Sequence, residues 1–440
     1  MPKSLKIAHV VRRYSAAEWG GTETVVCHTV AEQRKLGHEP RIFCTAALQP
    51  AGGPPEGVSC FPYFYPYFPM PAADRLRLDK KGGSPYAPAL FRAVRDFRPD
   101  VIHIHAGGRL ACASVKLARR LGVPCVMSLH GGAAAVPASE MEEMLCPLRR
   151  KFPYGALLDR LLGMRFDPLA RVDAVICISH EEERLLRERH PGRIVRYLPN
   201  GVELELKRQE CRFPDGELKR QECRFPDGEL KRQECRFPVG EAALSPLRER
   251  SCINVLCVSR IDYQKNQLAL VELLAARPDC RLTLVGPLTA QWYADKIKAR
   301  VRELGVGDRF TLVPGLPPGS AELEAAFASA DVFVLPSVHE PFGIVALEAM
   351  ARGIPLIASN VGGLPDFVQD GTNGLLFDPS ASSGLVDAFD RLAALPPARV
   401  EQMVARARAT VEGYAWPNVV ARLMDLYGEV RAQRHVTCPP

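Results

Sequence analysis

Residues 331–359 read DVFVLPSVHEPFGIVALEAMARGIPLIAS and contain one complete strand–helix–strand unit. The first apolar run is typical of a buried strand. A loop around Glu340 follows, and the pattern predicts a helix that begins within Phe342–Ile344 and that Gly353 stops. The run PLIAS then predicts a second buried strand. The whole stretch is therefore typical of a parallel α/β sheet.

Apolar runs alternate with helical patterns along the rest of the chain. In the first half the expected strands are KIAHVV, PRIFCTA, DVIHIHA, PCVMSLHG, AVICIS and IVRYLPNG; in the second half they are INVLCVSR, RLTLVG, RFTLVPG, DVFVLPS, PLIASNVGG and GLLFD. Amphipathic stretches such as residues 22–37, which Gly37 ends, lie between them. Two such series predict an α/β fold with two doubly wound Rossmann-like domains. Ligands of these folds bind at the carboxyl ends of the strands, which here places them in a cleft between the domains.

The domain boundary is expected at the Pro-Asn-Gly turn of LPNGVE, residues 198–203. A chain of 440 residues exceeds what one hydrophobic core usually serves. The sequence therefore predicts an N-terminal domain over residues 1–198 and a C-terminal domain over residues 199–415.

A tandem repeat follows this boundary. ELKRQECRFPDG occupies residues 205–216 and 217–228, and ELKRQECRFPVG occupies residues 229–240. Solenoid repeats usually have about 20 or more residues per unit and differ in sequence. Near-identity at a short period instead indicates a duplication in a loop that tolerates insertion, so residues 205–240 are expected to be flexible. An interaction segment with regularly spaced cysteines is the alternative.

Composition excludes two classes of protein. The hydrophobic fraction of 47% is ordinary for a globular chain, and no apolar run approaches the ~18 residues that a membrane span needs. The first residues do not resemble a signal peptide, so a cytoplasmic location is expected. The 14 cysteines include no CxxC pair and no zinc-like spacing with histidine, which favours reduced thiols over a disulfide scaffold.

Positive charge is concentrated in the first half of the chain. Residues 1–198 contain 29 Lys and Arg against 19 Asp and Glu, a balance of +10. The rest has 57 − 29 = 28 basic and 50 − 19 = 31 acidic residues, a balance of −3. This asymmetry indicates either an anionic partner of the N-terminal domain, such as a lipid head group or a phosphorylated acceptor, or a merely basic surface. No nucleic-acid-binding signature accompanies it.

Two loops carry residue types that suit an anionic ligand. Gly20 and Gly21 in EWGGTETVV precede a helix, where the backbone can approach a ligand closely; a simple tight turn is the alternative. In VSRIDYQKN, Arg260 and Lys265 follow a strand and could converge on one diphosphate, because arginine offers a bidentate fork and lysine a point charge. A solvated charge pair is the alternative there.

Two carboxylates flank the start of the helix in the opening stretch. Glu340 precedes the helix and Glu348 lies within it, and their apolar surroundings argue against free solvation of both. The first-turn N–H groups of this helix attract anions. The two carboxylates could therefore accept hydrogen bonds from different hydroxyl-bearing parts of a ligand whose phosphates lie at the helix start. The turn GGLPD at residues 362–366 either closes over such a ligand or is purely structural.

Three histidines and an aromatic run have more than one interpretation. His103, His105 and His130 lie at strand ends beside glycines, where they either face the cleft or are satisfied structurally. The run FPYFYPYFP at residues 61–69 is either a packed loop or a surface patch at the mouth of the cleft, where it could meet a lipid or an acceptor.

Taken together, these motifs resemble the retaining nucleotide-sugar glycosyltransferases of the GT-B fold, family 4. The resemblance runs from GGTE through DVIHIH, LHG, PNGVE, SRIDYQKN and the opening stretch to GGLPDFVQDGTNGLLF and YAWPNVVARLMDLY. It implies that the last helix, about residues 416–440, crosses back to complete the N-terminal domain.

The resemblance also implies roles for the site residues. Arg260 and Lys265 would hold the donor diphosphate, and Glu340 would bind hydroxyls of the donor sugar. The backbone amides of three residues would assist Glu340: Phe342, Gly343 and Ile344. Glu348 would bind the ribose. The N-terminal domain would contribute Gly20 and Gly21 near the phosphates and His130 at the sugar. The residues implied in catalysis are Glu340, His130, Arg260 and Lys265.

The expected reaction moves a sugar from a nucleotide-diphosphate sugar to a hydroxyl acceptor, with retention, in polysaccharide, lipopolysaccharide or glycolipid assembly. A UDP- or GDP-sugar would be the donor. No bound cofactor is expected, and the lack of a DxD motif suits a metal-independent transfer. A glycan or lipid-linked acceptor and an anionic membrane surface are the expected partners. The alternatives are a phosphorylase or nucleotide-sugar epimerase of the same fold, or a non-catalytic sugar-nucleotide-binding scaffold.

Overall fold

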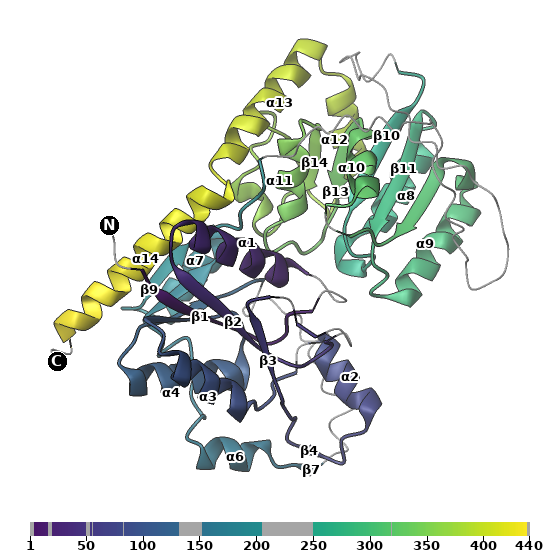
Figure 1. Cartoon of the computed structure of the whole chain (residues 1–440). Coiled ribbons are helices and arrows are strands. Elements are labelled where there is room, and N and C mark those ends of the chain that lie inside the picture. Colours follow the sequence, from purple (N-terminus) through teal and green to yellow (C-terminus); the bar gives the residue numbers. More distant parts are fainter. Residues whose placement is uncertain are drawn as a thin grey trace.

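The structure is a computed structural model that describes residues 4–15, 20–49, 53–54, 56–81, 83–131, 152–204, 250–317 and 319–437. Two parallel sheets dominate it, one in each half of the chain, and helices cover them (Figure 1). This arrangement confirms the predicted α/β class with two doubly wound Rossmann-like units. The tandem repeat at residues 205–240, with its predicted flexibility, lies outside the described residues.

The first sheet has seven parallel strands in the order β3-β2-β1-β5-β6-β8-β9. These are β1 (Lys6–Val11), β2 (Glu39–Thr45), β3 (Val58–Phe61), β5 (Val101–Ile104), β6 (Cys125–Ser128), β8 (Ala174–Cys177) and β9 (Ile194–Tyr197). The helices that connect them are α1 (Gly21–Lys35), α3 (Pro88–Phe97), α4 (Gly108–Leu121) and α7 (His180–Arg189). Six of the strands were predicted. The edge strand β3 was missed because its four residues, VSCF, are only half-buried and lack a continuous apolar run.

The second sheet has six parallel strands in the order β12-β11-β10-β13-β14-β15, all of them predicted. These are β10 (Ile253–Val258), β11 (Cys280–Gly286), β12 (Phe310–Pro314), β13 (Val332–Leu335), β14 (Leu356–Ser359) and β15 (Leu375–Phe377). The α-helices of this half are α8 (Gln267–Ala276), α9 (Gln291–Glu303), α10 (Ala321–Ala328), α11 (Ile344–Ala351), α12 (Gly384–Ala393) and α13 (Pro397–Glu412).

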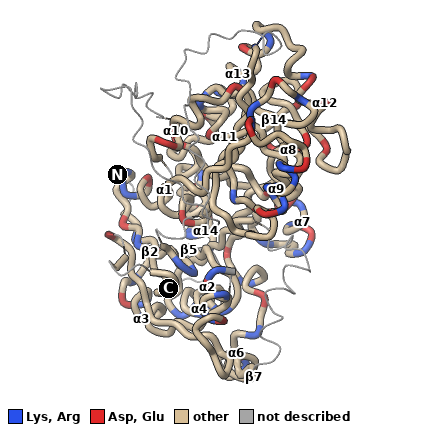
Figure 2. Tube along the Cα trace, turned by 90° about the vertical axis from the view of Figure 1, so that its right-hand side faces the viewer, with Lys and Arg blue, Asp and Glu red and all other residues tan. Residues whose placement is uncertain are grey.

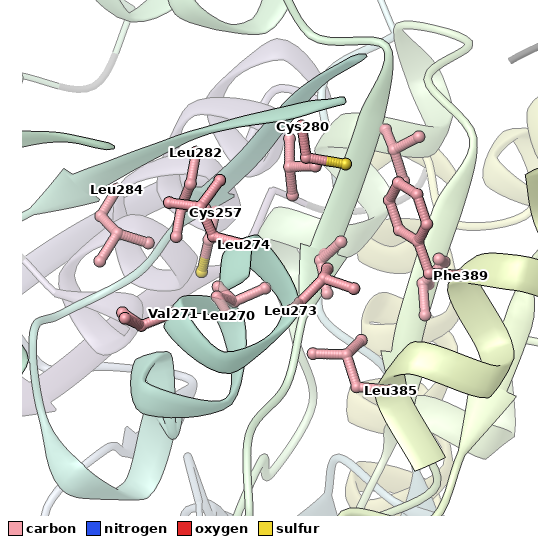
Figure 3. Packing of buried hydrophobic residues seen from close by; sticks show 14 of the residues in the cluster. Cys257, Leu270, Val271, Leu273, Leu274, Cys280, Leu282, Leu284, Leu385 and Phe389 are labelled. Atoms are coloured by element: carbon pink, nitrogen blue, oxygen red, sulfur yellow. The ribbon is translucent and has the colours of Figure 1, made fainter. Parts of the chain in front are cut away.

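One face of the second sheet is closed by α8 and α12. Leu270, Leu273 and Leu274 of α8 are almost fully buried against strand residues such as Leu282, and Phe389 of α12 completes the cluster (Figure 3). Each such side chain contributes about 1.5–3 kcal/mol through removal from water. This packing fixes the carboxyl ends of the strands, where the loops with candidate site residues begin.

The last helix, α14 (Trp416–Thr437), packs on the first sheet, although it follows the second sheet in sequence (Figure 1). Val419, Leu423 and Tyr427 are buried against Leu5 and Ile7. This packing is the crossing that the family resemblance implies for the end of the chain. Among the described residues, no helix has both the length and the apolar character that crossing a bilayer requires.

A small outlying layer extends the N-terminal half. It contains α2 (Ala72–Lys81), α6 (Gly155–Leu161) and a two-stranded antiparallel ribbon of β4 (Tyr67–Phe68) and β7 (Phe152–Pro153). Figure 1 shows this ribbon and α6 at the end of the molecule farthest from the second sheet. The aromatic run at residues 61–69 enters this layer, where Tyr65 is buried and Phe68 is exposed. The predicted patch at the mouth of the cleft is therefore wrong in its location, because the exposed end of the run, in β4, lies away from the second sheet (Figure 1).

Candidate active site

A buried ion pair lies where two strands of the second sheet end. The Lys265 Nζ and the Glu340 Oε2 are 2.6 Å apart, and the Ser337 hydroxyl donates to the same carboxylate oxygen over 3.1 Å. Lys265 closes the 3-10 turn η4 (Tyr263–Lys265) after β10, and Glu340 lies in the loop between β13 and α11. Only 12% of the lysine side chain and 9% of the glutamate side chain are exposed. Each charge therefore depends on the other, because an unpaired charge at such depth is costly.

The loop that contains Glu340 is held on both sides. The Val338 N–H donates to the Gln264 carbonyl over 2.9 Å, and the Gly363 N–H donates to the Glu340 carbonyl over 3.1 Å. Gly362 has φ +56°, and a β-carbon there would lie 2.0 Å from the Glu340 carbonyl oxygen. The turn at residues 362–366 therefore packs directly on the Glu340 backbone and needs glycine to do so.

The start of α11 leaves its first N–H groups available. Gly343 caps the helix at φ +91°, Ile344 is the first helical residue, and Phe342 is buried just before them. The helix therefore begins within the predicted range. None of these three amides donates a hydrogen bond to another described residue. Free N–H groups at a helix start attract anions.

Arg260 follows β10 and is about half exposed. Its guanidinium lies 3.8 Å from the Asp262 carboxylate, a weak contact at a solvated position. No described contact joins Arg260 to Lys265, so the two predicted diphosphate ligands are neighbours in the chain without touching. Arg260 is free to turn toward an anion at little cost.

Glu348 differs from an ordinary exposed helix glutamate. It lies half-buried in the second turn of α11, and burial raises the pKa of its carboxyl to about 7. The positive charge of Arg352 opposes this shift, whereas Glu324 and Glu203 add to it. The carboxyl is therefore poorly solvated and would gain from hydroxyl donors.

The segment of the N-terminal half around His130 contacts the loop that contains Glu340. It lies just beyond β6, and Gly131 follows at φ +115°. A β-carbon on Gly131 would lie 2.9 Å from the Pro341 side chain, so this backbone touches the loop that contains Glu340. The Nδ1 atom of His130 is inaccessible to water and has no partner among the described residues.

His130 is the end of a chain of hydrogen-bonded imidazoles. Its Nε2 lies 2.8 Å from Nδ1 of His105, whose Nε2 lies 3.0 Å from Nδ1 of His9. The His9 Nε2 lies 2.8 Å from the Gln33 side-chain oxygen. Burial lowers the pKa of His9 and of His130 to about 4, and that of His105 well below its usual range. The chain is therefore uncharged at neutral pH.

His103 has the structural role that was one of its two predicted interpretations. Its ring nitrogens meet the Tyr427 hydroxyl at 2.6 Å and the Ser128 hydroxyl at 2.7 Å. Sequence reasoning missed His9, Gln33 and Tyr427. A histidine in the middle of the apolar strand KIAHVV was the signal available for the first of these, since such a buried polar group needs a partner.

Gly20 and Gly21 lie at the start of α1, as the sequence indicates. A β-carbon on Gly20 would lie 3.2 Å from a carboxylate oxygen of Glu23, whereas Gly21 has open space on that side. Glu23 is buried and lies 3.4 Å from Arg13. No described contact joins these glycines to Lys265.

Two family descriptions match the chain, one in each half. Residues 19–206 match "Glycosyltransferase Family 4" and residues 250–410 match "Glycosyl transferases group 1". Together these spans include every site residue that the sequence predicted, whereas His9 and Tyr427 lie outside them.

Among curated proteins, the chain is 38% identical over 137 residues to the D-inositol 3-phosphate glycosyltransferase of Actinosynnema mirum. That match covers 31% of this chain and 32% of the relative. The chain spans less than half the length of the first curated relatives that it matches.

Solved structures resemble the chain over nearly its whole length. The sucrose-phosphate synthase of Thermosynechococcus elongatus has a TM-score of 0.66 at 22% identity, covering 98% of this chain and all of that one. The Anabaena protein HepE, solved with UDP and glucose, has a TM-score of 0.64 at 18% identity, covering 97% of this chain and 100% of that chain. At such identities the likeness concerns the fold, and both folds have the same two-domain architecture as this chain.

Proposed function

The chain belongs to the family 4 glycosyltransferases of the GT-B fold, and from that membership we propose that it moves a sugar from a nucleotide-diphosphate sugar to a hydroxyl acceptor with retention of configuration. The observation that carries the proposal is the buried Lys265–Glu340 pair beside the free N–H groups of α11. The Lys265 ammonium suits a phosphate and the Glu340 carboxylate suits sugar hydroxyls, and both side chains are already largely removed from water. A UDP-sugar is the first donor to test, since HepE was solved with UDP and glucose.

Different residues of the C-terminal domain bind different parts of the donor. Lys265 and Arg260 bind the diphosphate, and the amides of Phe342, Gly343 and Ile344 add hydrogen bonds at the start of α11. Glu340 accepts hydrogen bonds from the donor sugar, and Glu348 accepts them from the ribose. His130 meets the sugar from the N-terminal side. Gly20 and Gly21 leave room for the phosphates at the start of α1.

The bond from the anomeric carbon to the phosphate oxygen breaks in the reaction, and a bond from that carbon to the acceptor oxygen forms. Positive charge develops on the sugar and negative charge on the departing diphosphate. Lys265, Arg260 and the helix start stabilise the second of these charges without a metal ion. In a front-face reaction the acceptor hydroxyl gives its proton to an oxygen of the leaving phosphate, and the acceptor enters from the same face. The configuration is then retained.

A lipid-linked acceptor is proposed from the outlying layer of the N-terminal half. Phe68 and Phe152 face each other across the β4–β7 ribbon, and Leu157 and Leu161 lie one turn apart on α6. The exposed fractions of these four side chains lie between 61% and 72%. Figure 2 shows basic residues on the adjacent helix α2, which contains Arg75, Arg77 and Lys80. Apolar side chains beside basic ones suit a peripheral contact with an anionic membrane.

A donor screen tests the proposal. The protein is incubated with UDP-, GDP- and ADP-sugars, with and without hydroxyl acceptors, and release of nucleotide is followed with the anomeric configuration of the product. Acceptor-dependent release and a retained product are expected. Conversion of the donor without an acceptor would instead indicate an epimerase, and an absence of turnover with bound nucleotide would indicate a scaffold.

A further inference from the structure

The three-imidazole chain joins the interior of the first sheet to the junction between the domains. His9 belongs to β1, His105 follows β5 and His130 follows β6, and these strands are neighbours in the sheet. The chain begins at the buried amide of Gln33 on α1 and ends at the Nδ1 of His130, which has no partner among the described residues. A buried polar chain of this length needs an explanation beyond packing, because apolar side chains would fill the same space at lower cost.

A metal site is the first alternative. One nitrogen from each of His9, His103 and His105 lies within 4.8 Å of the others, which suits three ligands of one ion. However, all six ring nitrogens of these histidines already have hydrogen-bond partners. An ion would have to break several of those bonds, so a hydrogen-bonded relay explains the cluster better.

The direction of the hydrogen bonds follows from the Gln33 amide. Its oxygen, which only accepts, faces the His9 Nε2. Its nitrogen is buried and has no hydrogen-bond partner among the described residues. Gln33 lowers the pKa of the Tyr427 phenol, against the larger raising effect of burial. The amide is therefore oriented by groups on both sides.

Each neutral imidazole has one N–H and one lone pair. Once the Gln33 oxygen fixes which nitrogen of His9 carries the proton, the hydrogen bonds fix the protonated nitrogen of each following imidazole. His9 must carry its proton on Nε2 and accept at Nδ1. His105 then donates from Nε2 and accepts at Nδ1, and His130 donates from Nε2.

We propose that Gln33 acts as a positioning residue that fixes the tautomer of His130, so that its Nδ1 presents a lone pair at the junction between the domains. The backbone that follows His130 reaches the loop that contains Glu340, because a β-carbon on Gly131 would lie 2.9 Å from the Pro341 side chain.

A lone pair at this position selects its ligand by hydrogen-bond polarity. Nδ1 is closed to water in this structure, so a ligand must first displace what covers it. The lone pair then accepts from an O–H group, whereas an ionised phosphate has no proton to offer at this nitrogen. His130 therefore favours the hydroxyl-bearing end of a donor over its phosphates. This last step rests on the proposed function, whereas the tautomer itself does not depend on any substrate.

The tautomer is measured on the full chain labelled with ¹⁵N-histidine. Long-range ¹H–¹⁵N spectra at pH 7 distinguish a protonated ring nitrogen from an unprotonated one, and the His130→Asn variant identifies the His130 signals. We expect Nδ1 of His130 to be unprotonated. A proton found on Nδ1 in the unaltered protein would overturn the proposal, and this result needs no variant other than the folded His130→Asn protein that assigns the signals.

Gln33→Met removes the acceptor at nearly constant volume and should give a mixture of both tautomers at His130. Ser128→Ala is the matched control, because it removes a buried hydrogen-bond partner of His103 and leaves the relay intact. An unchanged His130 tautomer in a folded Gln33→Met protein, or an equal change in Ser128→Ala, would contradict the assignment.

Binding data separate this inference from the proposed function. Gln33→Met should bind a sugar nucleotide about tenfold more weakly, yet bind the nucleoside diphosphate alone as before; Ser128→Ala should alter neither affinity. A confirmed tautomer with no sugar-nucleotide binding at all would reject the proposed function while leaving the relay in place. Equal weakening for both ligands in Gln33→Met would show that Gln33 has only a structural role.

Discussion

Lys265 and Glu340 neutralise each other over 2.6 Å, although one is assigned to a phosphate and the other to a sugar. A donor that binds Lys265 through its diphosphate must take over part of this interaction. The site is thus stabilised before substrate arrives. Binding replaces part of the Lys265–Glu340 interaction by an interaction between Lys265 and the donor diphosphate.

Removal of either partner should damage stability as well as activity. Lys265→Ala leaves a buried carboxylate unpaired and should lower the free energy of unfolding by about 3–5 kcal/mol. It should also reduce transfer by about 10² or more, as should Glu340→Ala. The double variant Lys265→Met/Glu340→Gln removes both charges and should regain most of the lost stability without regaining activity. Denaturant unfolding and a transfer assay measure the two effects, and additive losses of stability would show that the pair is not coupled.

Arg260 should affect binding without affecting stability. Because its contact with Asp262 is solvated, Arg260→Ala should change the free energy of unfolding by less than about 1 kcal/mol. Loss of its guanidinium should weaken binding of a nucleoside diphosphate about tenfold and reduce the dependence of that affinity on salt. Arg281→Ala, at the opposite end of the neighbouring strand β11, is the control for a lost surface charge. Calorimetry at two salt concentrations gives both quantities, and equal effects of the two variants would reject a direct contact.

Gly362 should tolerate no side chain, because its β-carbon would lie 2.0 Å from the Glu340 carbonyl oxygen. Gly362→Ala should displace the loop that contains Glu340 and reduce transfer by about tenfold or more. Gly371→Ala is the matched control, since Gly371 has φ +70° but nothing within 4 Å of the added carbon. Both variants bear the strain of a positive φ, and only the first bears the steric clash. Similar activities for the two would mean that the turn does not position Glu340.

Glu348 should make nucleotide binding depend on pH. Burial raises the pKa of its carboxyl to about 7, so the carboxyl titrates near neutral pH. Ribose hydroxyls donate to the ionised form, so binding lowers the pKa and releases a proton. Affinity should therefore rise with pH, by about tenfold between pH 6 and pH 8. The diphosphate also titrates in this range. The pH dependence of the affinity is therefore compared with that of Glu348→Gln, which has no carboxyl group to titrate at this position. Calorimetry in buffers of different ionisation enthalpy counts the protons, and identical counts in both proteins would exclude Glu348 from the ribose site.

Deletion of residues 205–228 leaves one copy of the 12-residue repeat. Every candidate site residue lies outside the deleted segment, so thermal stability and transfer activity should both stay near those of the full chain. Replacement of the same residues by a Gly/Ser linker of equal length controls for the shortened connection. Loss of activity in both variants would show that the repeat has a function of its own.

The sequence predicted the fold well because parallel strands are buried on both faces and read as continuous apolar runs. KIAHVV, INVLCV and DVFVL needed no tertiary knowledge to be recognised as strands. The edge strand VSCF did need such knowledge, since its four residues are only partly buried and its apolar pattern is correspondingly weak.

The candidate site was predictable only for residues that come directly after a strand in the sequence. Arg260, Lys265 and Glu340 lie in short loops at strand ends, so their sequence positions already place them at one edge of the sheet. Gln33 and Tyr427 were not predictable as partners of His9 and His103. They lie on helices far away in sequence, and only the packing of α1 and α14 brings their polar atoms to the strands.

The packing of α14 also constrains how the chain is made. Tyr427 contacts His103 across 324 positions of sequence, and Val430 is buried in the same cluster as Leu5. During synthesis on the ribosome, the first domain therefore lacks part of its own core until the last residues have emerged. The second domain has no such dependence and can fold first. A nascent chain stalled before α14 should expose the apolar surface around Leu5 and Ile7, so we expect the first domain to complete its core only after the second domain has been synthesised.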